Sequence, residues 1–225
     1  YSMLSPSIIW LLLFLAIPIG LITVISFTVN GGFGEIIFSF SLDSYKMAFS
    51  SLYIGVIMRS LWWAILTTVI CLIIAYPFAY FIAHTKKWKN LLLVLVMIPF
   101  WSNLLIRLYA WIILLNNDGI INNLLMSLGI TTEPITMLYT PSSVLIGMVY
   151  GFLPFMILPI YSSIEQLNKS YLEASEDLGA TPVKTFLKVT LPLTFPGILA
   201  GFVITFVPAV SVFVVTDLLT GKKLL

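Results

Sequence analysis

Long apolar runs dominate the pattern of hydrophobic and polar positions along this chain. Five runs reach the roughly 20 residues that a helix needs to cross a bilayer: 8–28, 61–83, 91–115, 139–164 and 196–216. A membrane β-barrel would instead show strands that alternate apolar and polar positions, whereas residues 91–96 are apolar throughout. The pattern therefore predicts an all-α integral membrane protein with five spans.

The composition supports this prediction. Of the 225 residues, 60% are apolar and 9% are charged, whereas a soluble domain has about 45–50% apolar and about 25% charged residues. These proportions exclude a soluble enzyme, a disordered chain and a nucleic-acid-binding protein. Cys71 is the only cysteine, so the chain forms no internal disulfide.

The distribution of lysine and arginine predicts the orientation in the membrane. Short cytoplasmic loops carry an excess of these residues. The loop after the second span and the loop after the fourth each contain three lysines: Lys86, Lys87 and Lys89, and Lys169, Lys184 and Lys188. Residues 116–138, between the third and fourth spans, contain no lysine or arginine. The two lysine-bearing loops and the N-terminus are therefore expected in the cytoplasm.

The longest predicted cytoplasmic loop, 166–192, begins with the signature of a short helix. Ser170 and Glu173 have the spacing of a capping box, in which each side chain bonds an amide at the helix start. Gly179 suits the left-handed conformation that often follows a helix end. The acidic surface of this helix favours docking to a protein, because helices on membrane surfaces usually carry lysine and arginine.

A second short helix is expected after this glycine. Thr181 is a good N-cap and Pro182 fits the first helical position. The helix is expected to run toward Val189 and to end before Pro192. The loop thus predicts two helices that meet at a glycine turn.

The residues of this loop also resemble a known family. Glu173-Ala174-Ser175, three residues, Gly179, nine residues and then Val189-Thr190-Leu191-Pro192 is similar to the EAA loop of ABC importer permeases. Ser175 replaces an alanine of that pattern, and Val189 replaces an isoleucine. The resemblance implies that the loop docks on a cytoplasmic ATPase through residues that include Glu173, Ala174, Ser175, Gly179, Leu191 and Pro192.

Three further segments resemble the polyamine branch of this family: 99–109, 153–156 and 159–165. The resemblance implies one MetI-like helical permease domain over 1–225, with a sixth span absent from this chain. It also implies a bacterial inner-membrane location and import of spermidine or putrescine. The implied partners are a second permease subunit, two ATPase subunits that bind ATP and Mg²⁺, and an extracytoplasmic binding protein, with no cofactor in this subunit.

A polyamine pathway needs carboxylates and aromatic faces that attract ammonium groups. Asp217 is the only acid at the end of a predicted span, and Phe213 lies one turn before it. Trp101 and Asn103 are candidate pathway residues in the third span. Arg107 would repel a polycation, so a structural role is expected, with an acid, backbone carbonyls or the interface as its partner.

Two other readings of the function remain open. The cargo could be sulfate, thiamine or ferric iron, although an anion site should need more than one buried cation. Alternatively, the chain could be an ion-coupled carrier, although such carriers bury ionisable residues that are scarce here. The sequence contains no phosphate-binding loop, metal cluster or nucleophile–base set, so no catalytic residue is expected.

Overall fold

The computed structural model describes residues 5–30, 36–37 and 39–211. The chain divides into two compact units, Tyr1–Arg59 and Ser60–Leu225. α4 (Ser51–His84) belongs to both, because it crosses the boundary between them along the chain. Pro77 is inside this helix, which begins ten residues before the predicted second span because residues 52–58 are also largely apolar.

The first unit contains one long apolar helical segment and a short ribbon. α1 (Ser5–Leu11), a π-helical turn (Leu12–Ala16) and α2 (Ile17–Ser26) follow each other without a break. β1 (Val29–Asn30) pairs antiparallel with β2 (Ile36–Ile37), a detail that the all-α prediction did not include. α3 (Asp43–Ala48) comes next, and the hydroxyl of Tyr45 lies 2.9 Å from that of Ser26 at the end of α2.

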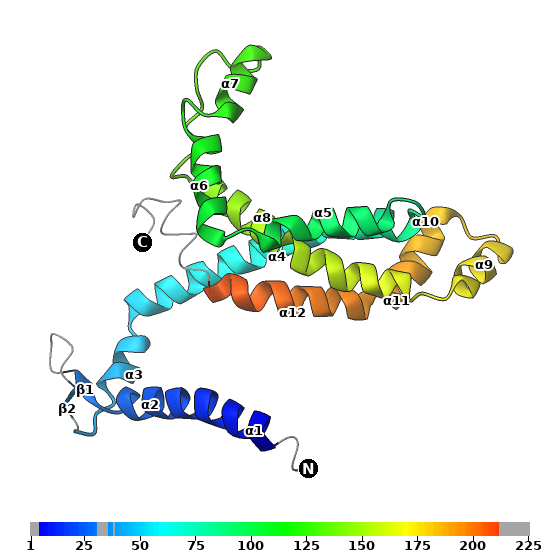
Figure 1. Cartoon of the computed structure of the whole chain (residues 1–225). Coiled ribbons are helices and arrows are strands. Elements are labelled where there is room, and N and C mark those ends of the chain that lie inside the picture. The colour runs from blue at the N-terminus through cyan, green and yellow to red at the C-terminus, as the bar shows by residue number, and fades with distance from the viewer. Residues whose placement is uncertain (1–4, 31–35, 38, 212–225) are drawn as a thin grey trace. The chain divides into compact units, whose positions relative to one another are not determined.

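The second unit is built from helices that meet around α8 (Figure 1). Its elements after α4 are α5 (Lys89–Trp101), α6 (Leu104–Leu115), α7 (Ile120–Ser127), α8 (Pro141–Glu165), α9 (Lys169–Asp177), α10 (Pro182–Thr185), a π-helical turn (Phe186–Thr190), α11 (Leu191–Leu193) and α12 (Phe195–Ser211). α12 packs along α8, and α5 and α6 also contact α8.

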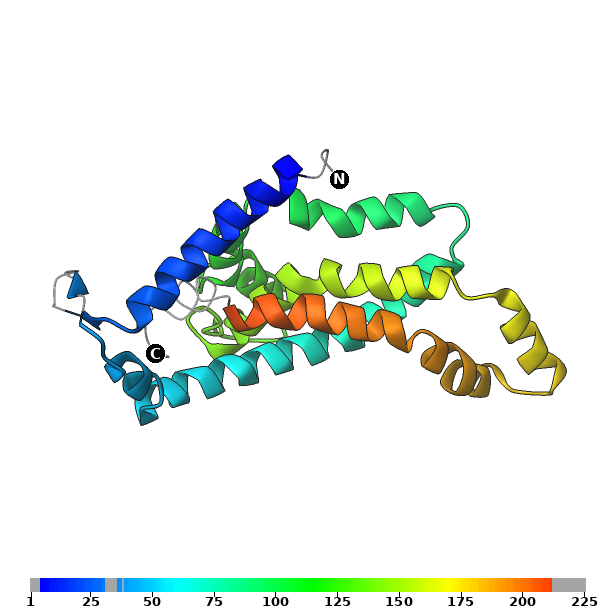
Figure 2. The same cartoon turned by 90° about the horizontal axis from the view of Figure 1, so that it is seen from below.

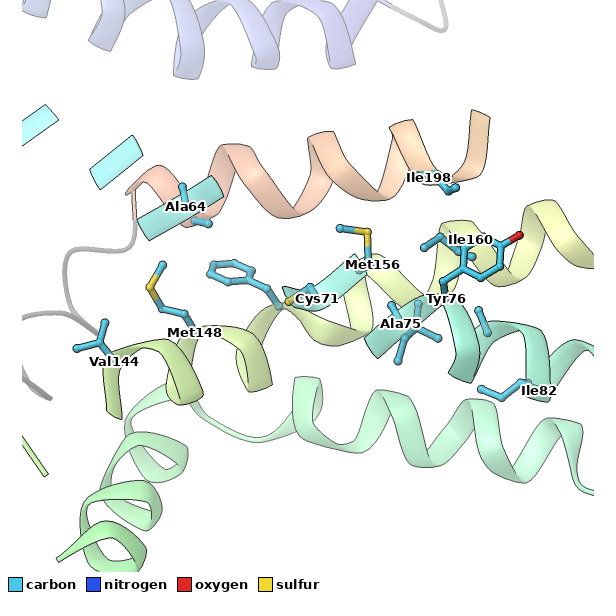
Figure 3. Packing of buried hydrophobic residues seen from close by; sticks show 14 of the residues in the cluster. Ala64, Cys71, Ala75, Tyr76, Ile82, Val144, Met148, Met156, Ile160 and Ile198 are labelled. Carbon is cyan, nitrogen blue, oxygen red and sulfur yellow. The ribbon is translucent and has the colours of Figure 1, made fainter. Parts of the chain in front are cut away.

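Small residues allow these helices to approach closely. On α4, Ala64, Cys71, Ala75 and Ala79 are all fully buried, and Figure 3 shows the first three near Met148 and Met156 of α8. On α12, the buried residues Gly197, Gly201, Thr205 and Ala209 recur every four residues. Small residues at this spacing are typical of helix contacts in membranes, where close van der Waals packing replaces the hydrophobic effect.

The helices of the described residues give three to five candidate membrane spans. Three single helices are long and apolar enough to cross a membrane: Pro6–Ser26, Tyr53–His84 and Pro141–Glu165. Two bent pairs also qualify, Lys89–Trp101 with Leu105–Ser127, bent by 94°, and Pro182–Leu193 with Phe195–Ser211, bent by 59°. Residues 212–216 of the predicted span 196–216 lie outside the described residues.

The predicted third span, 91–115, is two helices rather than one. Ser102 and Asn103 have extended backbone angles, and the Asn103 side chain accepts a hydrogen bond of 2.8 Å from the amide of Leu105 as the N-cap of α6. Pro99 lies in the last turn of α5. A capping asparagine shortly after a proline is a strong signal for a new helix start, and it overrides the continuous apolar pattern.

A buried side chain of α7 joins two parts of the segment between α6 and α8. Asn122 of α7 is fully buried. Its amide donates to the carbonyls of Asn116 and Ile135 at 3.1 and 2.9 Å, and its oxygen accepts from the amide of Ile135 at 2.9 Å. These bonds tie α7 to the chain segments around Asn116 and Ile135. Such bonds are expected for a buried amide, whose polar groups need partners.

Candidate functional site

The 166–192 loop extends beyond the ends of α8 and α12 (Figures 1 and 2). Its first helix, α9, starts two residues earlier than the proposed capping box requires. The N-cap is Asn168, whose side chain accepts a hydrogen bond of 3.1 Å from the amide of Ser170. The Ser170–Glu173 capping box was therefore wrong, because asparagine caps at least as well as serine and lies closer to the end of α8.

Glu173 is consequently left facing outward. Its side chain is exposed, and within the described part of the chain it forms no hydrogen bond or ion pair. Glu176 and Asp177 are exposed on the same helix. A carboxylate that has no role inside the subunit can contact a basic partner without loss of internal bonds.

Gly179 ends α9 in the predicted left-handed conformation, with φ of +74°. Its amide donates to the carbonyl of Glu176 at 2.8 Å, and the amide of Ala180 donates to that of Ser175 at 3.1 Å. These two bonds define a Schellman motif, which satisfies carbonyls that the helix end would otherwise leave open. The motif fixes the direction in which the chain leaves α9.

The second helix packs against the first through a buried hydroxyl pair. Thr181 caps α10, with Pro182 in its first turn, as predicted. The Ser175 hydroxyl lies 2.9 Å from that of Thr185, and both side chains are buried. The serine that departs from the alanine of the EAA pattern therefore adds a hydrogen bond between the two helices.

Large apolar side chains are exposed around this turn. Leu178 has 88% of its surface exposed, and Tyr171, Val183 and Leu187 are each more than half exposed. Contiguous exposed apolar residues on a protein surface mark interaction sites. The loop therefore presents an apolar patch beside acidic side chains, on a helix pair whose geometry is fixed internally.

The helix that contains Pro192 continues further than predicted. α10, the π-helical turn and α11 run together to Leu193, with Leu191 half-buried, Pro192 exposed, and the chain bending at Thr194. The amide of Leu191 bonds the carbonyl of Phe186, five residues back. This wider turn and the position of Pro192 at the start of α11 let the helix accommodate a proline that has no amide hydrogen.

The bend at Thr194 is fastened to α4. The hydroxyl of Tyr76 lies 2.8 Å from that of Thr194, and Thr194 donates to the carbonyl of Thr190 at 2.8 Å. The ring of Phe186 makes edge contacts with Tyr76 and Tyr80 at centroid distances of 5.5 and 5.9 Å. The base of the loop is thus joined to two membrane helices, α4 and α12.

A cavity of about 350 Å³ lies beside the break between α5 and α6. Its lining is mostly aromatic and apolar: Phe100, Ser102, Arg107, Leu108, Trp111, Gly147, Met148, Gly151, Phe152 and Phe155. Arg107 is half-buried, donates from Nη1 to the carbonyl of Pro99 at 2.8 Å, and lies 6.0 Å from the ring centre of Tyr150. It therefore bridges the break through a backbone carbonyl of α5.

Of the sequence-predicted pathway residues, Trp101 and Asn103 are not among the residues that line this cavity. Trp101 is 74% exposed at the end of α5, and Asn103 is used as the cap of α6. Phe213 and Asp217 lie outside the described residues. The structure instead adds the aromatic pair Phe152 and Phe155, which the sequence could have signalled by their spacing of three around a proline. Among the described residues, no group of three or more His, Cys, Asp or Glu could hold a metal.

Comparison with known proteins adds three results. Residues 75–224 match the family model described as the binding-protein-dependent transport system inner membrane component. The chain is 44% identical to the spermidine/putrescine transport system permease protein PotB of Escherichia coli (strain K12), over 95% of this chain and 78% of that protein. It is also 44% identical to the PotB protein of Haemophilus influenzae, over 96% and 76%.

Solved structures share the fold at lower identity. A bacterial ABC transporter involved in the import of the acidic polysaccharide alginate superposes with a TM-score of 0.77 at 20% identity, over 99% of this chain and 79% of that one. A bacterial alginate ABC transporter in complex with a pentasaccharide-bound periplasmic protein gives 0.69 at 18% identity, over 98% and 86%.

Proposed function

Because the chain belongs to the family of binding-protein-dependent transport system inner membrane components, we propose that it forms part of the membrane pathway for spermidine or putrescine in an ATP-driven importer. The chain is a multi-pass inner-membrane permease subunit of an ABC importer. The observation that carries the polyamine cargo is 44% identity over 95% of the chain to a spermidine/putrescine permease.

The proposed partners follow from the family and from the 166–192 loop. A second, related permease completes the pathway, and an extracytoplasmic binding protein delivers the cargo. Two cytoplasmic ATPase subunits bind ATP and Mg²⁺, and one of them holds the exposed patch around Leu178 and Glu173. This subunit carries no ATPase site and catalyses no reaction itself.

In the proposed mechanism, closure of the ATPase pair moves the 166–192 loop as one body. The buried Ser175–Thr185 pair keeps its two helices together. The movement reaches α12 through Thr194 and α4 through Tyr76, since these side chains are hydrogen-bonded. The permease pair then shifts between inward- and outward-facing states, which ATP and cargo bind with different affinities.

In this proposal, the cavity beside α6 does not bind ammonium groups, and Arg107 in its lining has a structural role. Arg107 is a permanent cation, and its hydrogen bond to Pro99 supports a role in bracing the break between α5 and α6. Ammonium groups are assigned to Asp217, with Phe213, Trp101 and Asn103 as further pathway residues. These four assignments rest on the sequence pattern alone.

An Asp217→Asn variant is expected to lower polyamine uptake while leaving assembly and basal ATPase activity of the complex unchanged. The amide keeps the size of the side chain but removes the charge that attracts ammonium. Uptake of labelled spermidine by the reconstituted complex measures the effect. Uptake at the wild-type rate would remove Asp217 from the pathway.

The proposed docking surface is tested by charge reversal at Glu173. A Glu173→Lys variant is expected to reduce the ATPase that co-purifies with the permease several-fold, because a like charge then faces the basic partner site. Glu133→Lys is the matched control, since Glu133 is also exposed but lies in the loop predicted to be extracytoplasmic. Equal co-purification by both variants would contradict docking through α9.

A further inference from the structure

A second cavity, of about 400 Å³, lies at the root of the 166–192 loop. It is lined by the ends of several elements: Tyr80, Ala83, His84, Thr85, Lys86, Lys89, Ile164, Glu165, Leu167, Lys169, Leu172 and Thr190. Its volume is within the range of roughly 300–1,000 Å³ that is usual for small-molecule sites. The cavity shares Lys169 and Leu172 with α9, but it does not include Glu173 or Leu178, the residues to which ATPase docking is assigned above.

The charged side chains in its lining are unbalanced. Lys89 is paired with Glu165, with 2.5 Å between Nζ and Oε1. Lys86 and Lys169 also line the cavity, and Lys169 acts electrostatically on the same Glu165. Three lysines therefore share one carboxylate, and the described lining has an excess of two positive charges.

The partial charges at the helix ends beside the cavity do not cancel its positive charge. α5 begins at Lys89 and α9 at Lys169, whereas α4 ends at His84 and α8 ends at Glu165. Helix starts carry a positive partial charge and helix ends a negative one of similar size, so the four contributions offset. Lysine side chains thus decide the electrostatic character of the site.

His84 and several apolar side chains complete the lining. His84 contacts the carbonyl of Tyr80 through Nδ1 at 2.8 Å, so Nδ1 donates and Nε2 is left over for another partner. Ala83, Ile164, Leu167 and Leu172 supply apolar surface on the same wall. The cavity therefore combines cationic and apolar faces.

We propose that this cavity binds a phosphate-bearing anion. Lysine is a common phosphate ligand, acting as a mobile point charge, and the excess of two positive charges in the lining is available to the oxygens of one phosphate group. Basic pockets between membrane helices on the cytoplasmic side are a recognised form of site for anionic lipid headgroups. The positive-inside bias explains lysines on this side, but it does not explain their convergence on one cavity.

The source of the phosphate is either a phospholipid headgroup or a free phosphate. α4 and α8 are candidate spans that end at His84 and Glu165, which places the cavity at the level where headgroups lie. The apolar wall also suits the glycerol and upper acyl region of a lipid. These two features favour phosphatidylglycerol as the occupant.

The test uses the purified importer complex in nanodiscs of phosphatidylcholine mixed with phosphatidylglycerol, followed by delipidation and native mass spectrometry. A Lys86→Gln/Lys169→Gln variant is expected to retain roughly thirtyfold less phosphatidylglycerol, the effect of losing two lysine contacts with an anionic lipid. A Lys86→Arg/Lys169→Arg variant should retain it, because the charge is kept. Lys87→Gln/Lys188→Gln removes the same charge from positions outside the cavity lining.

A second arm identifies a soluble ligand. Inorganic phosphate is added to the complex in phosphatidylcholine nanodiscs, and thermal unfolding is measured. Stabilisation by phosphate that is lost only in the Lys86→Gln/Lys169→Gln variant, without selective lipid retention, would assign the site to free phosphate. Equal lipid retention by that variant and by the Lys87→Gln/Lys188→Gln control, together with no effect of phosphate, would overturn the proposal.

Discussion

A Gly179→Val variant is expected to lose ATP-driven polyamine uptake. Gly179 has φ of +74°, a conformation that costs an ordinary residue about 1–2 kcal/mol and a β-branched one more. Relief of this strain breaks the Schellman bonds and redirects α10 relative to α9. A docking surface that forms only at this extra cost binds its partner roughly tenfold to thirtyfold more weakly. Uptake and co-purified ATPase measure the loss.

The matched control for this variant is Gly179→Asn. Asparagine is the other residue found in this position of helix ends, so the loop should keep its shape and most of its uptake. A β-carbon at Gly179 would meet no atom of this chain within 4 Å, so a steric clash inside the subunit does not explain a defect. Normal uptake by Gly179→Val would contradict the role assigned to the turn.

A Gly197→Ala variant is expected to destabilise the packing of α12 on α8. A β-carbon at Gly197 would overlap that of Ser163 and lie 2.8 Å from the carbonyl oxygen of Pro159. The two helices must then separate along their contact, which costs about 1–3 kcal/mol in an overpacked interface. The yield of monodisperse protein and its thermal unfolding in detergent should both fall markedly.

Two further variants separate overpacking from other effects of the same substitution. Gly151→Ala adds a methyl group to α8 where no atom lies within 4 Å, so stability should be unchanged or rise by about 0.5–1 kcal/mol. Gly197→Ala combined with Ser163→Gly removes one of the two clashing groups and should recover part of the loss. Unchanged unfolding of Gly197→Ala would show that the helices are not packed as described.

The overall fold was predictable because it depends on hydropathy. The all-α membrane fold and the family assignment are both confirmed. The break in the segment 91–115 was not predicted, because hydropathy averages over two polar residues in an apolar run. It depends on the specific hydrogen bonds of Asn103 and Arg107, which no apolar count registers.

Some features of the 166–192 loop could also be predicted from the sequence, and others could not. The turn at Gly179 and the start of the helix at Thr181 follow from local chemistry and could be placed from the sequence. Asn168 and Ser170 both suit an N-cap, so local propensity could not choose between them. The bond from Tyr76 to Thr194 joins residues 118 positions apart, and only the packing of α4 against the base of the loop reveals it.

The central claim is that this chain forms the membrane pathway of an ATP-driven polyamine importer. Its most direct test is uptake of labelled spermidine and putrescine into proteoliposomes that contain the complete complex and the binding protein. We expect polyamine uptake that requires ATP, with no uptake of sulfate or thiamine under the same conditions. Uptake of sulfate or thiamine in place of polyamines, or polyamine uptake that continues without ATP, would contradict the claim.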